Sequence, residues 1–315
     1  MDEPLLPLEV EEWLSWLAAE KGRAPSTLAA YRRDARRFWR WLTAEAGGDG
    51  SGGAVALADV DERRIEAYIA DLQGAGLAPE TVKRSVVVVR SLYRFLVEEE
   101  RLPTDPGADV AVPPVPAGLP KALDEDEVTM LLDAVVGDEP VARRDRAILE
   151  VLYGTGLRIS ELVGLSLGAV DLESRLLRAF GKGSKERVVP IGRLAAKALE
   201  EWLSPAGRGA MAPAQWRRRG DAEAVFLNRR GGRLTRQGAW LVVKRYGEAV
   251  GLGEKLSPHV LRHSCATHML DHGADIRSVQ TLLGHASIST TQVYTKVATE
   301  RLFAAYRAAH PRAVR

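Results

Sequence analysis

The stretch LLRAFGKGSKERVVPI, residues 176–191, differs in pattern from the rest of the chain. Two short, largely apolar runs flank Gly181 and Gly183, and glycines between such runs are typical of a turn that joins two strands. The sequence before and after this stretch mostly repeats apolar residues at the spacing of a helix face. The chain is therefore predicted to be mainly α-helical with a small β-hairpin or sheet.

A second segment, LPTDPGADVAVPPVPAGLP, predicts how the chain is divided. Because proline interrupts helices and favours an extended backbone, we interpret residues 102–120 as an interdomain linker. The linker separates a helical domain, residues 1–101, from a mixed domain, residues 121–300, and residues 301–315 form a C-terminal tail. Apolar periodicity predicts helices near residues 8–21, 26–46, 60–74, 79–100, 124–135 and 141–165.

Composition excludes several classes of protein. The 315 residues are 46% hydrophobic and 27% charged, as in an ordinary globular protein, and no apolar run approaches the roughly 20 residues of a membrane span. The acidic start MDEPLLPLEVEEW lacks the basic residues that open a secretory signal. The single cysteine, Cys265, excludes an intrachain disulfide. We therefore expect a cytoplasmic protein without a membrane partner.

The basic residues are unevenly distributed, although the net charge is only +2. Between Lys21 and Leu42 there are seven basic residues and one acidic residue, Asp34. At about 100° per residue, one arc of roughly 100° on the predicted helix 26–46 holds Arg33, Arg36, Arg37 and Arg40. Lys83 and Arg84 add basic groups on the helix 79–100. A solvated face is the alternative, but such faces usually mix charges, so we predict that these six residues bind double-stranded DNA.

The motifs that would bind common cofactors are incomplete. The run that begins at Gly154 has Ile159 where a dinucleotide-binding fingerprint needs its third glycine. The run FGKGSK has Leu176 where a phosphate-binding loop needs its first glycine. Cys265 has no CxxC partner for a zinc site. We therefore expect no cofactor and no metal.

The stretch SPHVLRHSCATHMLDH, residues 257–272, holds four of the six histidines: His259, His263, His268 and His272. Serine followed by proline is a typical helix start. On that helix His259, Arg262 and His263 lie within about 100° of one another, whereas the other two histidines project from the opposite side. Zinc held by His259 and His263 is an alternative, but the fixed charge of Arg262 opposes a dication. Cationic groups near a helix N-terminus indicate an anion, and a phosphate fits the basic helix upstream.

Several motifs, in their order and spacing, resemble those of the tyrosine recombinases: GTGLRISELVGL at 154–165, GKGSKERVVPIG at 181–192 and LSPHVLRHSCATHMLDHGADIRSVQTLLGHASISTTQVYTKV at 256–297. The ending, YTKVATERL…HPRA at 294–313, is most similar to the XerC/XerD type, nearer XerD. The resemblance covers essentially the whole chain. It implies a helical core-binding domain of the SAM-like type followed by a mixed α/β catalytic domain.

The resemblance assigns the family's catalytic set to Arg158, Lys182, His259, Arg262, His285 and Tyr294. It implies that Tyr294 attacks a DNA phosphate and forms a 3′-phosphotyrosine, which retains the energy of the broken bond without ATP. The two arginines would bind the non-bridging oxygens, Lys182 would protonate the leaving 5′ oxygen, and the two histidines would assist. Glu161 occupies the family's supporting acidic position. Lys185 and Tyr306 are the weaker alternatives for the acid and the nucleophile.

The resemblance implies a site-specific recombinase that resolves chromosome dimers at a dif-like site, as a tetramer on DNA with itself or with a paralogue. A septal DNA translocase of the FtsK type is the implied further partner. The tail would dock on a neighbouring protomer, with packing on its own domain as the alternative. Other interpretations within the same chemistry are an integrase or resolvase of a mobile element or plasmid, and a type IB topoisomerase. A DNA-binding regulator without catalytic activity is the alternative from a different class.

Overall fold

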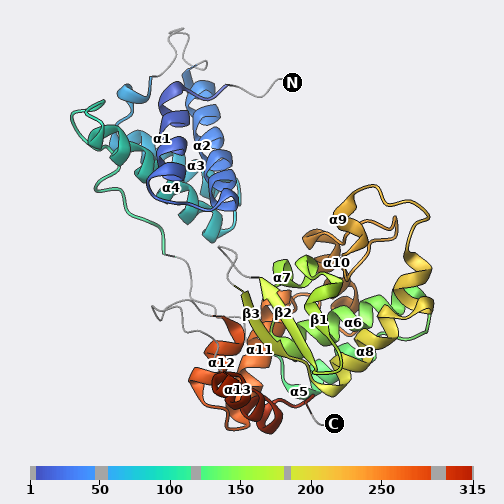
Figure 1. Cartoon of the computed structure of the whole chain (residues 1–315). Coiled ribbons are helices and arrows are strands. Elements are labelled where there is room, and N and C mark those ends of the chain that lie inside the picture. Colours follow the sequence, from blue (N-terminus) through green and yellow to red (C-terminus); the bar gives the residue numbers. More distant parts are fainter. Residues whose placement is uncertain (1–4, 47–55, 115–121, 181–185, 285–295, 314–315) are drawn as a thin grey trace. The chain divides into compact units, whose positions relative to one another are not determined.

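The computed structural model of the chain describes residues 5–46, 56–114, 122–180, 186–284 and 296–313. The chain forms two compact units, Met1–Gly118 and Leu119–Arg315, and the division between them falls inside the predicted linker (Figure 1). Helices dominate both units, and the second also contains a small sheet, so the predicted fold class is confirmed. No helix within the described ranges is long and apolar enough to cross a membrane.

The helices of the first unit lie close to their predicted limits: α1 (Leu8–Ala19), α2 (Pro25–Ala46), α3 (Glu62–Gly74) and α4 (Pro79–Glu98). Proline opens α2 and α4, at a position where the helix needs no backbone N–H. Asp61 caps α3, because its side chain accepts a hydrogen bond from the Arg64 N–H at 2.9 Å. Aromatic side chains fill the core, and the rings of Phe38 and Tyr68 meet edge to face with centroids 4.9 Å apart.

The first part of the predicted linker packs on the first unit. Val110 is buried, and Arg90 on α4 donates hydrogen bonds to the carbonyl oxygens of Ala108 and Val110 at 3.0 and 3.2 Å. Leu102 and Val112 also pack against this core. The apolar side chains among the prolines therefore anchor the start of the segment, which its proline-rich composition does not reveal.

The second unit contains a three-stranded antiparallel sheet, nine described α-helices and two short helical turns of other types, η2 (Leu167–Ala169) and η4 (Pro205–Gly209) (Figure 1). The strands are β1 (Val170–Asp171), β2 (Leu176–Phe180) and β3 (Glu186–Pro190). The helices are α5 (Glu125–Asp133), α6 (Pro140–Thr155), α7 (Ile159–Gly164), α8 (Arg193–Leu203), α9 (Arg219–Ala222), α10 (Arg236–Ala249), α11 (Pro258–Asp271), α12 (Ile276–Leu283) and α13 (Lys296–Ala309). In the middle strand, Leu177 pairs with Val170 and Val189. Both strands of the predicted hairpin are confirmed, β1 is an additional edge strand, and the turn glycines lie outside the described residues.

The single helix predicted over residues 141–165 is wrong, because two helices occupy this stretch. α6 ends at Thr155, and Gly156 adopts a left-handed conformation with a φ of 60°, which favours glycine and ends the helix. The chain then runs to Arg158, whose extended backbone precedes the first turn of α7. Apolar residues continue at helical spacing across this turn, so periodicity alone does not reveal it. The turn places Arg158 at a helix N-terminus.

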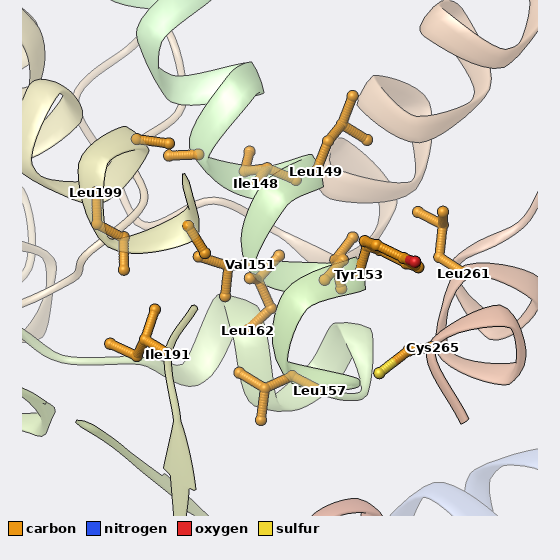
Figure 2. Packing of buried hydrophobic residues seen from close by; sticks show 14 of the residues in the cluster. Ile148, Leu149, Val151, Tyr153, Leu157, Leu162, Ile191, Leu199, Leu261 and Cys265 are labelled. Atoms are coloured by element: carbon orange, nitrogen blue, oxygen red, sulfur yellow. The ribbon is translucent and has the colours of Figure 1, made fainter. Parts of the chain in front are cut away.

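The core of the second unit forms around α6, which is buried along most of its length (Figure 2). Ile148, Leu149 and Val151 are 0% exposed. α6 packs against α8, which contributes Leu199, and against α11, which contributes Cys265. Because close packing on several sides leaves a helix little freedom to move, the turn at the end of α6 has a firm base.

The described part of the C-terminal tail packs against its own unit. α13 begins before the predicted boundary at residue 301 and contacts α11, α12 and β3. The Tyr306 hydroxyl is buried and donates a hydrogen bond to the Gly154 carbonyl oxygen at 2.7 Å, and Arg312 pairs with Glu150. A single chain does not test the docking of this tail on a neighbouring protomer, which stays a prediction.

Gly192 provides a test of how the tail is held. A Cβ atom at this position would lie 2.5 Å from the Arg312 carbonyl oxygen and 2.8 Å from the Tyr306 hydroxyl oxygen. Gly192→Ala is expected to displace the backbone at Arg312 and to lower the free energy of unfolding by about 1–3 kcal/mol. In hydrogen exchange, amides of residues 302–313 should exchange faster while those of α6 stay protected. Gly164→Ala, with no atom within 4 Å, is the control, and equal tail protection in both variants contradicts the prediction.

Candidate active site

Arg158 stands at the start of α7, directly after the turn that ends α6. Its backbone N–H donates a hydrogen bond to Glu161 Oε2 at 2.8 Å, and its Nη1 donates to Glu161 Oε1 at 2.9 Å. The same carboxylate therefore caps the helix and holds the arginine side chain. The Arg158 side chain is still 38% exposed, so part of its guanidinium is accessible to a ligand.

The helix that carries His259 and Arg262 begins as the sequence predicts. Ser257 caps α11, because its Oγ accepts a hydrogen bond from the Val260 N–H at 3.3 Å, and Pro258 takes the first helical position. His259 follows in the first turn and is exposed. Arg262 lies one turn further along, on the same side of the helix.

Arg262 reaches the end of α6 from α11. Its Nη1 donates a hydrogen bond to the Gly156 carbonyl oxygen at 2.6 Å, and its Nη2 donates to the Leu283 carbonyl oxygen at 2.5 Å. The residue is buried, and burial lowers the pKa of its guanidinium to about 10. The neighbouring charge of Arg158 acts on this pKa in the same direction. Arg262 therefore stays charged at neutral pH.

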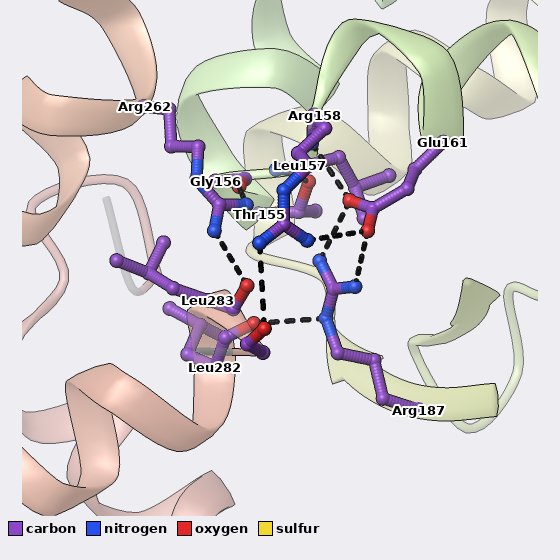
Figure 3. Close-up of polar contacts among 10 residues, drawn as sticks. Thr155, Gly156, Leu157, Arg158, Glu161, Arg187, Arg262, Leu282 and Leu283 are labelled. Carbon is purple, nitrogen blue, oxygen red and sulfur yellow. Dashed lines mark hydrogen bonds and ion pairs between the residues drawn. The ribbon is translucent and has the colours of Figure 1, made fainter. Parts of the chain in front are cut away.

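A third arginine, Arg187 on β3, completes the group (Figure 3). Its Nη1 and Nη2 donate hydrogen bonds to the two oxygens of Glu161 at 2.5 and 2.8 Å, and its Nε donates to the Leu282 carbonyl oxygen at 3.1 Å. The side chain is only 6% exposed. Sequence reasoning missed Arg187. The available signal is strand alternation, because Arg187 lies two residues before Val189 and shares its buried face.

The charges around Glu161 are unequal. Burial raises the pKa of the Glu161 carboxyl. The hydrogen bonds and charge of Arg187, together with the hydrogen bonds from Arg158, lower this pKa by more than burial raises it, so the net shift is downward. The carboxylate is thus ionised at neutral pH and faces three guanidinium groups. This excess of positive charge, next to a partly exposed arginine, suits a phosphate of DNA.

Three members of the predicted catalytic set, Lys182, His285 and Tyr294, lie outside the described residues, as does the alternative acid Lys185. Of the predicted site, the structure brings together Arg158 and Arg262 at the end of α6 and adds Glu161 beside them. The alternative nucleophile Tyr306 is buried, and burial raises the pKa of its hydroxyl well above the ordinary value. That environment disfavours the phenolate that a nucleophile needs.

Two of the remaining histidines of the cluster, His268 and His272, contact other side chains, and the third, His263, is exposed. His268 is buried, and its two ring nitrogens lie 2.8 Å from the Tyr153 hydroxyl oxygen and 2.8 Å from the Leu123 carbonyl oxygen. His272 lies 3.3 Å from Glu125 at the surface. These contacts agree with the interpretation of both residues as packing or surface histidines.

Cys265 is buried in the core, and burial raises the pKa of its thiol to about 12. It is therefore an unreactive thiol at neutral pH. Within the part of the chain that the structure describes, no three histidine, cysteine or acidic side chains gather in a way that could hold a metal ion.

The six residues predicted to bind DNA lie on two adjacent helices, α2 and α4. The exposed ones are Arg33, Arg40 and Lys83, whereas Arg36, Arg37 and Arg84 are half-buried. Arg37 and Arg84 both donate to the carboxylate of Asp34, with distances of 3.2 and 2.6 Å. Asp34 is 1% exposed. A buried carboxylate therefore holds two of the six basic side chains in place, and helix periodicity alone does not reveal this contact.

Sequence reasoning also missed a second group of basic residues, in the second unit: Arg217, Arg218, Arg219, Arg229, Arg230 and Arg236. All six are exposed, and none of their side chains forms an ion pair or hydrogen bond with another described residue. They lie in two loops and at the first positions of α9 and α10, and these segments are in contact, because Gly231 lies against Pro213 and the Arg233 N–H donates to Asp221 Oδ1 at 3.1 Å. We call these six residues the arginine loops. The signal that could have found them is their density in the sequence.

The sequence matches two family descriptions. Residues 121–301 match the phage integrase family, and residues 10–100 match the phage integrase N-terminal SAM-like domain. The two matched ranges fall in the two compact units.

Similar proteins carry the names of tyrosine recombinases. XerD of Corynebacterium glutamicum is 43% identical over 309 residues, which covers 96% of this chain and 97% of the relative. XerD of Mycobacterium tuberculosis is 43% identical over 319 residues, with 98% and 99% covered. XerC of Pelotomaculum thermopropionicum is 42% identical over 306 residues, with 97% and 99% covered.

Two similar solved structures contain DNA. One is the XerH site-specific recombinase bound to a palindromic difH substrate, with 22% identity, a TM-score of 0.64, and coverage of 95% of this chain and 88% of that chain. The other is the Tn1549 transposon integrase in complex with circular intermediate DNA, with 18% identity, a TM-score of 0.66, and coverage of 93% and 98%. At these identities the likeness shows a shared fold.

Because Glu161 is ionised in the folded protein, we predict how its replacement changes the pH dependence of stability. Because its folded pKa is lowered, its stabilising effect is complete above the unfolded pKa of about 4.3 and is lost as the pH falls through the folded pKa. Glu161→Gln should lower the free energy of unfolding by about 2–4 kcal/mol at pH 7. Between pH 7 and pH 3.5, this variant should lose less stability than the parent protein. Urea unfolding midpoints at pH 7 and pH 3.5 measure both effects, and hydrogen exchange of the α6 and α7 amides shows whether the change lies at this site.

Glu150→Gln is the control of opposite sign. Burial raises the pKa of the Glu150 carboxyl despite its pairing with Arg312, so protonation of this residue favours the folded state. Its replacement should therefore increase the loss of stability on acidification. The same pH dependence in both variants contradicts the assignment of Glu161.

Proposed function

Because this chain belongs to the phage integrase family of tyrosine recombinases, we propose that it cuts and rejoins double-stranded DNA at a specific site through a 3′-phosphotyrosyl intermediate. The observation that carries the proposal is the convergence of Arg158 and Arg262 at the turn that ends α6. Two guanidinium groups from separate helices, one of them partly exposed, form a site for the two non-bridging oxygens of a phosphodiester.

The chemistry that we propose uses the chain's own residues. Tyr294 attacks phosphorus, Lys182 donates a proton to the leaving 5′ oxygen, and His259 assists proton transfer at the tyrosine. His285 donates a hydrogen bond to the phosphate. Arg158 and Arg262 stabilise the negative charge that develops on the oxygens in the transition state. The phosphotyrosine then reacts with the 5′-hydroxyl of a second strand, so the number of phosphodiester bonds is unchanged and no ATP is required.

The biological role that we propose is the resolution of chromosome dimers at a dif-like site. In support, relatives named XerD match this chain over nearly their whole length. The enzyme would act in the cytoplasm as a tetramer on DNA, with itself or with a paralogue, and a septal DNA translocase would regulate it. An integrase or resolvase of a mobile element is the second candidate, since the Tn1549 transposon integrase shares the fold.

DNA contact is proposed for both units. The first unit contributes the α2 and α4 residues Arg33, Arg36, Arg37, Arg40, Lys83 and Arg84, and the second contributes the arginine loops. Exposed cationic side chains favour binding to a polyanion, as at Arg33, Arg40 and Lys83 on α2 and α4 and at all six residues of the arginine loops. Docking of the tail on a neighbouring protomer is part of the proposal, and it requires Tyr306 and Arg312 to leave the contacts that they make within the chain.

A covalent-adduct assay tests the reaction. A duplex with the dif-like sequence of the source chromosome, nicked beside the cleavage position, should trap the protein on DNA in a denaturant-resistant complex. Tyr294→Phe should abolish this complex and keep DNA binding. Arg158→Ala and Arg262→Ala should each slow its formation about 10²–10³-fold, because each removes a donor to the charged transition state.

The outcomes of this assay separate the candidates. An adduct with Tyr294→Phe means that another residue is the nucleophile. Binding without any adduct on nicked DNA supports a non-catalytic regulator. An adduct on ends of mobile elements but not on dif-like DNA supports the second candidate. Relaxation of supercoiled plasmid without strand exchange between duplexes indicates a topoisomerase.

The arginine loops predict how DNA binding depends on salt. Each phosphate contact adds about 0.9 to the slope of log affinity against log salt. Replacement of Arg217, Arg218 and Arg219 by serine should therefore lower the slope by about 2–3 and weaken binding to all sequences similarly. Fluorescence anisotropy with specific and scrambled duplexes measures both. The control is Arg101→Ser, because the Arg101 side chain is paired with Glu12. An unchanged slope in the triple variant excludes Arg217, Arg218 and Arg219 from the DNA interface.

A further inference from the structure

We propose that Arg187 is a positioning residue for strand cleavage: it binds Glu161 so that Arg158 keeps donors for the DNA phosphate, and it fixes the C-terminal end of α12. This inference rests on the proposed function and deepens it. Figure 3 shows the arrangement: Arg187 reaches the Glu161 carboxylate from β3, and Arg262 reaches the end of α12 from α11.

Arg187 is held by charge-assisted hydrogen bonds at a buried position. Its side chain is 6% exposed, and burial of an arginine is unfavourable unless its donors find acceptors. Both terminal nitrogens bind the Glu161 carboxylate in a forked pair, and Nε binds the Leu282 carbonyl oxygen. The orientation of the guanidinium is thus determined from two directions. Lysine has one donor centre and lacks this geometry.

Glu161 divides its bonds between two arginines. It accepts two hydrogen bonds from the Arg187 side chain and one from the Arg158 side chain, and it also caps α7. Without Arg187, Arg158 would be the one arginine still hydrogen-bonded to the buried carboxylate, and a forked pair between the two would be favoured. That pair would use Arg158 donors that the phosphate needs. Arg187 therefore limits how strongly Glu161 binds the catalytic arginine.

The end of α12 supplies the second part of the argument. The last carbonyl groups of a helix lack partners within the helix and carry partial negative charge. Here the carbonyl oxygens of Leu282, Leu283 and Gly284 accept hydrogen bonds from Arg187, Arg262 and Arg158 respectively, at 3.1, 2.5 and 3.4 Å. Each of the three arginines thus holds one carbonyl group at this helix end.

Gly284 shows how closely Arg187 and this helix end fit. Its φ is 65°, and a Cβ atom here would lie 3.1–3.2 Å from the Arg187 side chain. His285 is the next residue in the sequence, and Lys182 lies five positions before Arg187 on the chain that enters β3. Arg187 is therefore linked to Arg158 through Glu161, and through the backbone to the segments that carry His285 and Lys182.

The test measures cleavage and binding separately. Arg187→Met should slow single-turnover adduct formation on nicked DNA about 10²-fold, while the dissociation constant for DNA changes less than about 3-fold, because misplacement of a reacting group affects the rate more than the affinity. Arg187→Lys should recover little of this rate. In the double variant Arg187→Met, Glu161→Gln, Arg158 is released from a charged partner, so the rate should rise at least about 10-fold above that of Arg187→Met without recovery of thermal stability.

Arg144→Met is the matched control. Arg144 is equally buried, with a side chain 5% exposed, and it pairs with Asp145 away from the three arginines of the site. This variant should lose comparable thermal stability and keep its cleavage rate. Equal slowing in both variants, or a double variant no faster than Arg187→Met, overturns the proposal. If Arg187→Met does not fold, full activity of Arg187→Lys overturns it. Absence of an adduct with the parent chain contradicts the proposed function instead.

Discussion

The carboxylate of Glu161 connects the parts of this site more directly than any other group in the described residues. It caps α7 through the Arg158 N–H, holds the Arg158 side chain, and forms a forked pair with Arg187 of β3. A buried charge of this kind adds little net stability, because desolvation offsets much of the attraction. Its contribution is geometrical: its two oxygens accept four hydrogen bonds, and these bonds hold the Arg158 and Arg187 side chains beside the start of α7.

The apolar core and the polar contacts of the site occupy neighbouring parts of the second unit. Apolar side chains along α6 form the core, and the helix stops at Gly156, so the polar network begins where the apolar packing ends. Arg262 donates a hydrogen bond to the carbonyl group of that same glycine, and it stays charged at neutral pH although burial lowers its pKa to about 10. With three arginines and one carboxylate, the site holds more positive than negative charge before DNA binds. Electrostatic stabilisation of a transition state is most effective when such charges are already in place.

Sequence reasoning succeeded where a local signal exists and failed where contacts are distant in sequence. Apolar periodicity predicted α2 and α4 closely, and the Ser-Pro pair predicted the start of α11. Motif order assigned Arg158 and Arg262 to one site, and the structure places both at the end of α6. Apolar periodicity hid the turn at Gly156, since a left-handed glycine leaves the hydrophobic spacing intact. The burial of Arg187 and Asp34 was not predicted, because a charged residue signals exposure by default. Their burial depends on partners 26 and 50 residues away, which no local pattern encodes.

The single cysteine has a practical consequence for labelling the chain with fluorescent dyes. Cys265 is enclosed by the core, and its thiol stays protonated at neutral pH, so maleimide dyes should react with it slowly. The natural chain can therefore serve as an unlabelled background without replacement of any residue. One cysteine introduced on the surface of each unit would then accept a donor and an acceptor fluorophore. Energy transfer between them would measure the distance between the two labelled positions with and without DNA.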